Sequence, residues 1–288
     1  MPQPTGRDLY VDALLTNVSI GYKNAQYIAD EIAPLVPVQK QSGIVPKFDQ
    51  SHWFRDEAKL RAPGTKSIRS GYATDLTDKY FCDRYSFGHE IADEDRDNAD
   101  APFDMDRQGV ELVTDKIQMA REVKFATDFF TAGIWGTDKT GATDFTKWST
   151  YGSSAPLEDL TTFFDTVEGL IAREPNILVL GKQVWVKLKW HPDIIDTIKY
   201  TQRGQMTVQL FAALLEIEKV LIGRAIYTTS AEGTAEASVT YTRIWGKHAL
   251  ALYTPSSPAL LTPAAIYTFV WRRVSNALQY VKRMRDEE

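Results

Sequence analysis

Cysteine and histidine are scarce in this sequence. Its 288 residues include one cysteine, Cys82, and four histidines. A single thiol cannot form an internal disulfide, which excludes the class of small secreted domains that are stapled by disulfides. The histidines lie in different predicted elements and show no metal-ligand spacing, so the sequence contains no zinc-finger pattern. Cys82 falls in an aromatic, strand-like stretch, where we expect an inert, half-buried thiol.

A long, unbroken hydrophobic run is also missing. The longest stretch without Asp, Glu, Lys or Arg covers residues 248–271, and it contains Pro255, Pro258 and Pro263. These prolines would leave backbone groups without partners in lipid. The first residues contain no apolar signal region. We therefore expect neither a membrane span nor a targeting segment.

Net charge is small. The chain has 33 Lys and Arg against 38 Asp and Glu, a formal charge of −5. This acidity argues against a protein that coats nucleic acid electrostatically. Hydrophobic residues make up 43% of the sequence and charged residues 25%, which are ordinary globular values. The length allows one large or two modest domains with a real core.

Sequence patterns for nucleotide binding and for hydrolysis are incomplete. The stretch 136–143 has the glycine spacing of a phosphate-binding loop, but Ala142 replaces the required lysine and no buried strand precedes it. No Gly-x-Ser-x-Gly elbow is present. The sequence therefore predicts no cofactor and no catalytic residues.

An acidic stretch provides the one weak candidate for a metal site. Its carboxylates are Asp93, Asp95 and Asp97, spaced as at the start of a calcium loop. The sixth position is Asn98 where such loops need glycine, and the twelfth is Asp104, which is shorter than the usual glutamate. A solvated or partner-facing acidic loop remains the alternative.

The first third of the sequence looks incomplete by itself. Residues 1–37 resemble an arm with a short helix around 24–32, ended by Pro34 and Pro37. Residues 38–91 form two extended limbs around a charged tip with Ala-Pro-Gly, which predicts a long hairpin. A hairpin exposed on both faces is marginal alone in water. We therefore expect it to need a partner surface.

The remainder predicts a long helix followed by an α/β part. Apolar stripes indicate a helix over about 104–134 and a second over 156–173. From Pro175 onward short strands and helices alternate. The predicted strands are 177–180 and 219–227, a hairpin of 240–245 with 248–253, and a terminal strand region over 266–281.

Charge is distributed unevenly around the hairpin. Residues 39–69 contain seven Lys and Arg against three Asp and Glu, a net charge of +4. Residues 75–106 contain eleven acids against three bases, a net charge of −8. Opposite signs on adjacent exposed segments suit head-to-tail contact between identical subunits. Two solvated surfaces, or pairing within one subunit, are the alternatives.

Seven short segments, together with the order of arm, hairpin, long helix and α/β part, carry a resemblance to a known family. These segments are 17–22, 28–30, 34–38, 61–64, 175–180 with Trp185, 250–255 and 268–271. No single segment is specific, and the order of the parts is much more specific than any of them. The chain resembles the major capsid proteins of tailed phages with the Hong Kong 97 phage-type fold.

The resemblance implies an α+β fold with an N-terminal arm, an extended loop, a peripheral domain built on a spine helix, and an axial domain. The expected boundaries are 1–37 for the arm, 38–91 for the extended loop, 92–175 for the peripheral domain with its spine helix at about 104–134, 176–257 for the axial domain, and 258–288 for a return strand. Only about 37 residues precede the hairpin, which implies either a separate scaffolding protein or none.

In that family, hexamers and pentamers close into an icosahedral shell around double-stranded DNA, and the extended loop lies over a neighbouring subunit. The resemblance therefore implies a structural, non-enzymatic shell protein of the virion, assembled in the bacterial host cytoplasm. It implies no membrane and no sequence-specific DNA contact, and it leaves open separate scaffolding, portal and decoration proteins. We expect Arg55, Lys59, Arg61 and Lys66 to contact a neighbour's acidic segment. An encapsulin-like compartment, or an enzyme with an unrecognised site in the α/β part, are the alternatives.

Overall fold

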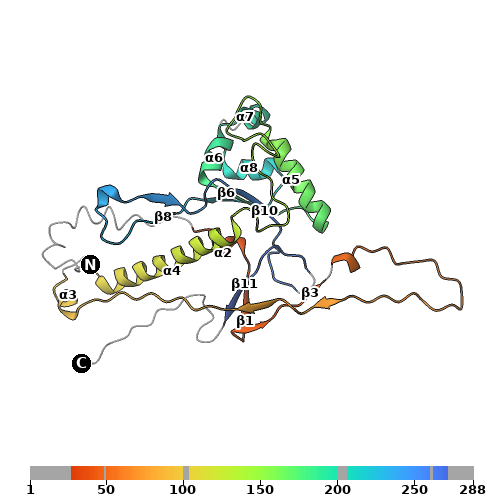
Figure 1. The fold of residues 1–288 in the computed structure, drawn as a ribbon, viewed down its shortest axis with the longest axis horizontal. Helices are drawn as coiled ribbons and strands as arrows, with labels where there is room; N and C mark the ends of the chain where they lie inside the picture. The colour runs from red at the N-terminus through yellow and green to blue at the C-terminus, as the bar shows by residue number, and fades with distance from the viewer. Residues whose placement is uncertain (1–26, 49, 100–103, 200–205, 260–261, 272–288) are drawn as a thin grey trace. The chain divides into compact units, whose positions relative to one another are not determined.

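The computed structural model describes residues 27–48, 50–99, 104–199, 206–259 and 262–271. The chain divides into two compact units. The body unit comprises Met1–Pro34, Tyr85–Ser256 and Pro263–Ile266, and the loop unit comprises Leu35–Arg84, Ser257–Thr262 and Tyr267–Glu288. Each unit is built around its own strand pairings, as Figure 1 shows.

The body unit contains a three-stranded sheet in the order β10-β6-β7. Strands β6 (Ile177–Gly181) and β7 (Lys219–Gly223) run parallel, with Ile177 opposite Lys219 and Gly181 opposite Gly223. Strand β10 (Ala249–Leu252) pairs antiparallel with β6. Every residue of β6 is buried, as expected for an apolar strand covered on both faces.

Four helices pack around this sheet (Figure 1). They are α5 (Pro156–Ile171), α6 (Lys182–Lys189), α7 (Pro192–Ile198) and α8 (Val208–Leu214). Thr207 begins α8, because its hydroxyl accepts a hydrogen bond from the Leu210 N–H at 3.2 Å. The core between sheet and helices includes Leu160, Leu180 and Phe211, all fully buried.

A second core joins the long helix α4 (Met105–Phe129) to the short helix α2 (Ala29–Ile32). The C-terminal half of α4 provides Phe125 and Ala126 to this core, and Phe130 follows directly after the helix. Helix α2 lies against α4 in Figure 1 and contributes the fully buried Ile32. A further short helix, α3 (Asp93–Asp97), precedes α4 in the chain.

Short strand pairs form the loop unit. Strands β1 (Leu35–Val38) and β11 (Thr268–Trp271) run parallel. Strand β2 (Ser42–Ile44) pairs antiparallel with β5 (Lys79–Phe81), and β3 (Lys47–Phe48) pairs with β4 (Thr74–Asp75). These two antiparallel pairs are the base of the predicted hairpin. Beyond them, a single 3-10 turn, η1 (Gln50–His52), is followed by irregular chain until β4.

Most predicted elements are present with shifted ends. The long helix ends at Phe129, five residues earlier than expected, and the predicted strand over 219–227 is split into β7 and β8 (Ile226–Thr228). The acidic loop contains the helix α3. Residues 24–26 of the expected arm helix and 272–281 of the terminal strand lie outside the described residues.

One predicted pairing is wrong. The strand β9 (Tyr241–Arg243) does not pair with β10; it pairs with β8, and β10 pairs with β6. The reason is Trp245, which is 1% exposed and holds the connecting turn in the core. Because this indole is buried, β9 and β10 are separated, although they are neighbours in the sequence and were predicted to pair. Within the described part of the chain, none of the helices is both apolar and long enough to cross a membrane.

Candidate assembly surfaces

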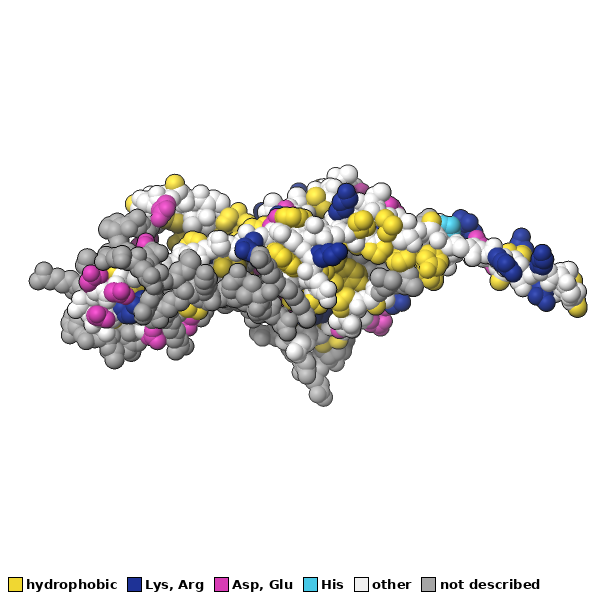
Figure 2. Space-filling view, turned by 90° about the horizontal axis from the view of Figure 1, so that it is seen from below, with side chains coloured by type: hydrophobic (Ala, Val, Ile, Leu, Met, Phe, Trp, Pro, Cys, Tyr) yellow, Lys and Arg dark blue, Asp and Glu magenta, His cyan; other side chains and the backbone are white. Residues whose placement is uncertain are grey.

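The most exposed part of the structure is the irregular segment 53–73, here called the tip segment. All of its residues except Glu57 are exposed. The predicted contact residues Arg55, Lys59, Arg61 and Lys66 all lie in it. In Figure 2, Lys and Arg side chains gather on the narrow projection that this segment forms. The structure thus places these cations together on one exposed loop.

Local hydrogen bonds shape the tip segment, and none of them crosses to another element. Arg61 donates to the Ser67 hydroxyl at 3.0 Å, and the Thr65 hydroxyl donates to the Ala62 carbonyl at 2.8 Å. Gly64 adopts a φ of +82°, which the turn requires and which glycine tolerates without strain. The segment therefore has a turn of its own but no hydrophobic core to hold it.

Two of the predicted contact cations have acidic or hydroxyl partners nearby, and two do not. Arg55 lies 3.4 Å from Glu57, and the Ser70 hydroxyl together with Arg55 lowers the pKa of Glu57. Arg61 has its bond to Ser67. Within the described residues, Lys59 and Lys66 contact no acid. Two exposed ammonium groups are therefore available for an outside partner.

Large apolar side chains accompany these cations. Leu60 is fully exposed, and Trp53, Phe54 and Ile68 are each more than half exposed. Isolated exposed apolar residues are normal on protein surfaces, but several on one coreless segment indicate an interaction site. Aromatic residues at the root of the segment contact one another, with the Trp53 and Tyr72 ring centroids 6.1 Å apart.

The base of the hairpin is better packed than its tip. Gly43 lies against the Tyr80 ring, where an added Cβ would come within 2.8 Å of a ring carbon. The Tyr80 ring in turn stacks on Phe269 of β11, with centroids 4.6 Å apart. The Lys47 ammonium lies 2.9 Å from the Asp78 carboxylate, and this hydrogen bond raises the pKa of Lys47. These contacts anchor the projecting segment within the loop unit.

Cys82 lies in this anchored base and is half-buried, as the sequence predicted. Its Sγ lies 3.6 Å from the Phe269 carbonyl oxygen. Burial raises the pKa of the thiol, which lowers its thiolate fraction at neutral pH. The environment is that of an unreactive thiol.

The acidic stretch in the body unit does not bring its three aspartates together. Asp93 pairs with Arg96 at 2.5 Å, and the helical turn directs Asp95 to a different side from Asp93 and Asp97. Nowhere in the described ranges do three or more His, Cys, Asp or Glu side chains gather as metal ligands would. The structure gives the metal hypothesis no support, and the exposed carboxylates fit the partner-facing alternative.

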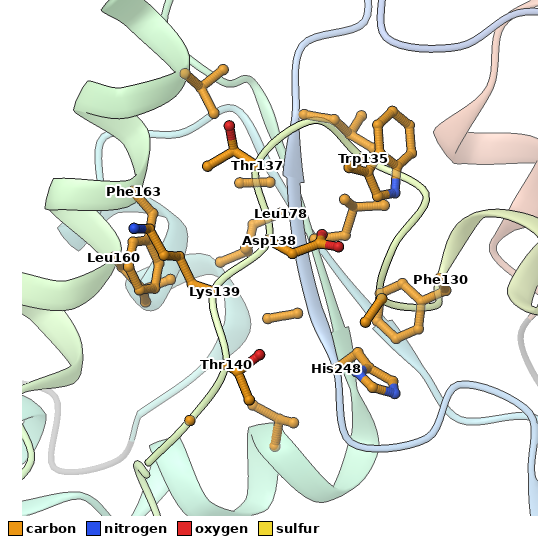
Figure 3. Close-up of a pocket in the computed structure, with 18 of the residues that line it drawn as sticks. Phe130, Trp135, Thr137, Asp138, Lys139, Thr140, Leu160, Phe163, Leu178 and His248 are labelled. Atoms are coloured by element: carbon orange, nitrogen blue, oxygen red, sulfur yellow. The ribbon is translucent and has the colours of Figure 1, made fainter. Parts of the chain in front are cut away.

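A cavity of about 1310 Å³ lies in the body unit between α5, β10 and the loop that follows α4. Figure 3 shows this loop crossing in front of the sheet, with Lys139 lying toward Phe163 and with Phe130 and His248 on the other side. Asp138, the one carboxylate among the described residues of its lining, accepts a hydrogen bond from the Gly133 N–H. The lining therefore offers apolar surface and cations, and no acid–base pair.

A buried Ser–His pair is the feature most like a catalytic constellation. Ser154 Oγ lies 2.8 Å from His191 Nε2, and His191 Nδ1 accepts from the Asp193 N–H at 3.2 Å. This second bond places the ring proton on Nε2, so the ring donates to Ser154 and cannot act as its base. The Ser154 hydroxyl donates to the Thr150 carbonyl at 2.8 Å. Burial lowers the pKa of His191. His191 therefore caps the start of α7, and its bond to Ser154 holds the loop that precedes α5.

Sequence reasoning missed the buried carboxylate of Glu122. It is 1% exposed and accepts hydrogen bonds from the Ile28 and Ala29 N–H groups, both at 3.0 Å, and from Trp245 Nε1 at 2.6 Å. A signal was available, because Phe125 and Ala126 follow Glu122 by three and four residues and share its helix face. A glutamate on an apolar helix face indicates a buried acceptor.

Comparison with known proteins bears on the three functions left open by the sequence, a phage shell protein, an encapsulin-like compartment and an enzyme. No family model matches the chain. It is 29% identical to the "Major capsid protein" of Burkholderia phage BcepMu over 248 residues, covering 85% of this chain and 76% of the relative. It is 28% identical to the "Major capsid protein" of Pseudomonas phage JBD67, covering 84% and 77%. The chain is similar to phage major capsid proteins.

A solved structure shares the fold. A phage-related protein from Bordetella bronchiseptica matches with a TM-score of 0.64 at 23% identity, over 91% of this chain and 83% of the other. The mixed helix and sheet fold is therefore shared with a phage-related protein. The relatives support a phage capsid function and do not favour the encapsulin-like alternative. Relatives with a structural role also suggest that the chain is not an enzyme.

Proposed function

We propose that this chain is the major shell subunit of a tailed phage, assembling into an icosahedral head of hexamers and pentamers around double-stranded DNA. Relatives named as major capsid proteins support a place in the virion capsid and a multi-subunit shell. Arm, extended loop, peripheral domain and axial domain are proposed with the boundaries expected from the sequence. Assembly in the host cytoplasm, with or without a separate scaffolding protein, belongs to the same proposal.

The observation that carries the proposal is the exposed, cationic and apolar tip segment. It presents Lys59 and Lys66 without acidic partners beside the exposed Leu60 and Ile68. Residues 75–106, which run from the second limb of the hairpin into the start of α4, have a net charge of −8, and α3 within them carries exposed carboxylates. Contact between the tip segment of one copy and the acidic stretch of another would cover the apolar residues and pair both charges.

The test is charge reversal at the tip. The variant Arg61→Glu/Lys66→Glu should stay folded by circular dichroism, because neither side chain contacts a core. It should fail to form the shells that we expect electron microscopy to show for the wild type. The matched control Lys116→Glu/Lys199→Glu changes the net charge equally at exposed positions outside the tip and should assemble. Normal particles from the tip variant would refute the assigned contact.

A further inference from the structure

Four cations crowd the carboxyl end of the parallel pair β6–β7. Lys182 follows β6 directly and Arg224 follows β7 directly, while Arg243 ends β9 and Lys189 ends α6. Burial, followed by Arg224, Arg243 and Lys189, lowers the pKa of Lys182. In the described part of the chain none of the four forms an ion pair. We call these four residues the carboxyl-end cluster.

The surrounding turn adds to this positive surface. The turn at Trp245 and Gly246 passes so close to β6 that a Cβ on Gly181 would lie 2.3 Å from the Gly246 carbonyl oxygen. Lys247 follows this turn and, with Lys187, lines the same cavity as Lys182 and Arg243. Among the described residues of that lining, Asp138 is the only carboxylate. The cations in this part of the lining therefore outnumber the described carboxylates.

The amino end of the same two strands carries the opposite charge. Glu174 precedes β6 by three residues, and Glu216 and Glu218 precede β7; all three are exposed. We call these three the amino-end cluster. Of the cations beside it, Lys219 pairs with Glu31 at 2.7 Å, while Arg173 donates to the Tyr253 hydroxyl at 3.0 Å and keeps its charge, so acids remain in excess among the described residues at this end. Glu218 accepts a hydrogen bond from Asn176 Nδ2 at 3.3 Å.

We propose that neighbouring copies of this chain meet head to tail, with the carboxyl-end cluster of one copy against the amino-end cluster of the next. A five-residue strand separates the two clusters by roughly 15 Å, so both sit on one rigid sheet. A heterologous contact of this kind uses two different patches on each subunit and generates rings when its rotation closes. The proposal rests on the proposed shell function and names a contact within it.

A second copy suits these charges better than nucleic acid does. Nucleic acid would use only the carboxyl-end cluster and would leave the amino-end cluster without a partner. The two clusters have opposite sign and lie at opposite ends of one element, which is what a repeating contact requires. The net charge of −5 for the whole chain also disfavours a nucleic-acid surface.

Reciprocal charge reversal in the full chain tests this contact. Lys182→Glu/Arg224→Glu should fold normally, because a glutamate suits the first turn of α6 and Arg224 is exposed. The second variant, Glu174→Lys/Glu216→Lys, reverses the other cluster. Each should lower the assembled fraction at least tenfold at low salt, measured by sedimentation velocity and electron microscopy. The variant with all four changes should recover assembly. An equimolar mixture of the two double variants should recover rings with an even number of copies, in which the two variants alternate.

The outcomes separate this contact from the proposed function. Failure of the wild type to form any assembly, whether shells or rings, would contradict the function itself. Assembly by the wild type and equally by Lys182→Glu/Arg224→Glu would overturn the contact alone, and weaker duplex DNA binding by that variant would then assign the cluster to nucleic acid. No recovery in the fourfold variant, or no even-numbered rings in the mixture, would also overturn it. An equal loss of assembly in the control Lys116→Glu/Lys199→Glu would overturn the contact as well.

Discussion

Removing the Glu122 carboxylate tests the packing of the body unit most directly. This one side chain accepts from the Ile28 and Ala29 N–H groups at the start of α2 and from the Trp245 indole. In Glu122→Ala all three donors lose their acceptor inside the core. Because an unsatisfied buried donor costs about 1–3 kcal/mol and the site relaxes partly, we expect a loss of roughly 3–5 kcal/mol in the free energy of unfolding.

Glu122→Gln should be milder. The amide keeps one acceptor oxygen, so it can satisfy the Trp245 indole or one backbone N–H, while its NH₂ group faces another donor. We expect a loss of about 1–3 kcal/mol. Urea unfolding followed by circular dichroism gives both values, and the exposed Glu168→Gln, expected within about 0.5 kcal/mol of the wild type, is the control. A loss below about 1 kcal/mol in Glu122→Ala would refute the reasoning.

The same carboxyl group should make stability depend on pH. Burial raises the pKa of Glu122 above its ordinary value, although hydrogen bonds from Ile28, Ala29 and Trp245 oppose the shift. The folded state therefore binds the proton more tightly than the unfolded chain does. This contribution to stability is present below the ordinary glutamate pKa and is lost as pH rises through the raised pKa. The advantage of the wild type over Glu122→Gln should thus shrink from pH 4 to pH 8, and a constant difference would contradict the assignment.

Two further predictions concern packing and thiol chemistry. Gly223→Ala should destabilise the body unit by about 1–3 kcal/mol, because its Cβ would lie 2.1 Å from Cγ of the buried Trp245; Gly169→Ala, which meets no atom within 4 Å in a helix, should instead stabilise by about 0.5–1 kcal/mol. An unchanged free energy of unfolding for Gly223→Ala, measured in urea, would refute the close approach of Gly223 to Trp245. Cys82 should react with a thiol reagent at pH 7 much more slowly in the folded chain than in urea, since burial raises its pKa; equal rates would contradict its placement beside Phe269.

Local patterns predicted much of the fold because they depend on few residues. The buried run of β6, the apolar stripe of α4 and the capping Thr207 were readable because period, burial and cap chemistry act within a dozen residues. The pairing of β10 was not readable. It depends on where Trp245 is buried, and that depends on Glu122 and Phe130, more than 100 residues earlier in the chain.

The candidate surfaces also divide into one that could be predicted from local sequence and one that could not. The basic tip segment was predicted, because an exposed run of Lys and Arg around Ala-Pro-Gly needs no tertiary information. The carboxyl-end cluster was not, since Lys182, Arg224 and Arg243 are far apart in sequence. They meet only because β6 and β7 run parallel and end side by side, and because β9 ends nearby. The sequence shows how charge is distributed along the chain. It does not show that residues following two parallel strands will lie at the same end of the sheet.

Apolar burial is concentrated in the body unit, while the tip segment buries almost nothing. If the tip segment contacts a neighbour as proposed, it loses conformational entropy on binding. This loss cancels part of the favourable free energy of the contact. The pairs it would form are exposed ion pairs, each worth under about 1 kcal/mol. Each contact is then weak and reversible, whereas one copy making several such contacts is held firmly. A shell built this way can release a misplaced subunit during growth and still be stable when closed, which a large apolar interface on a single face would prevent.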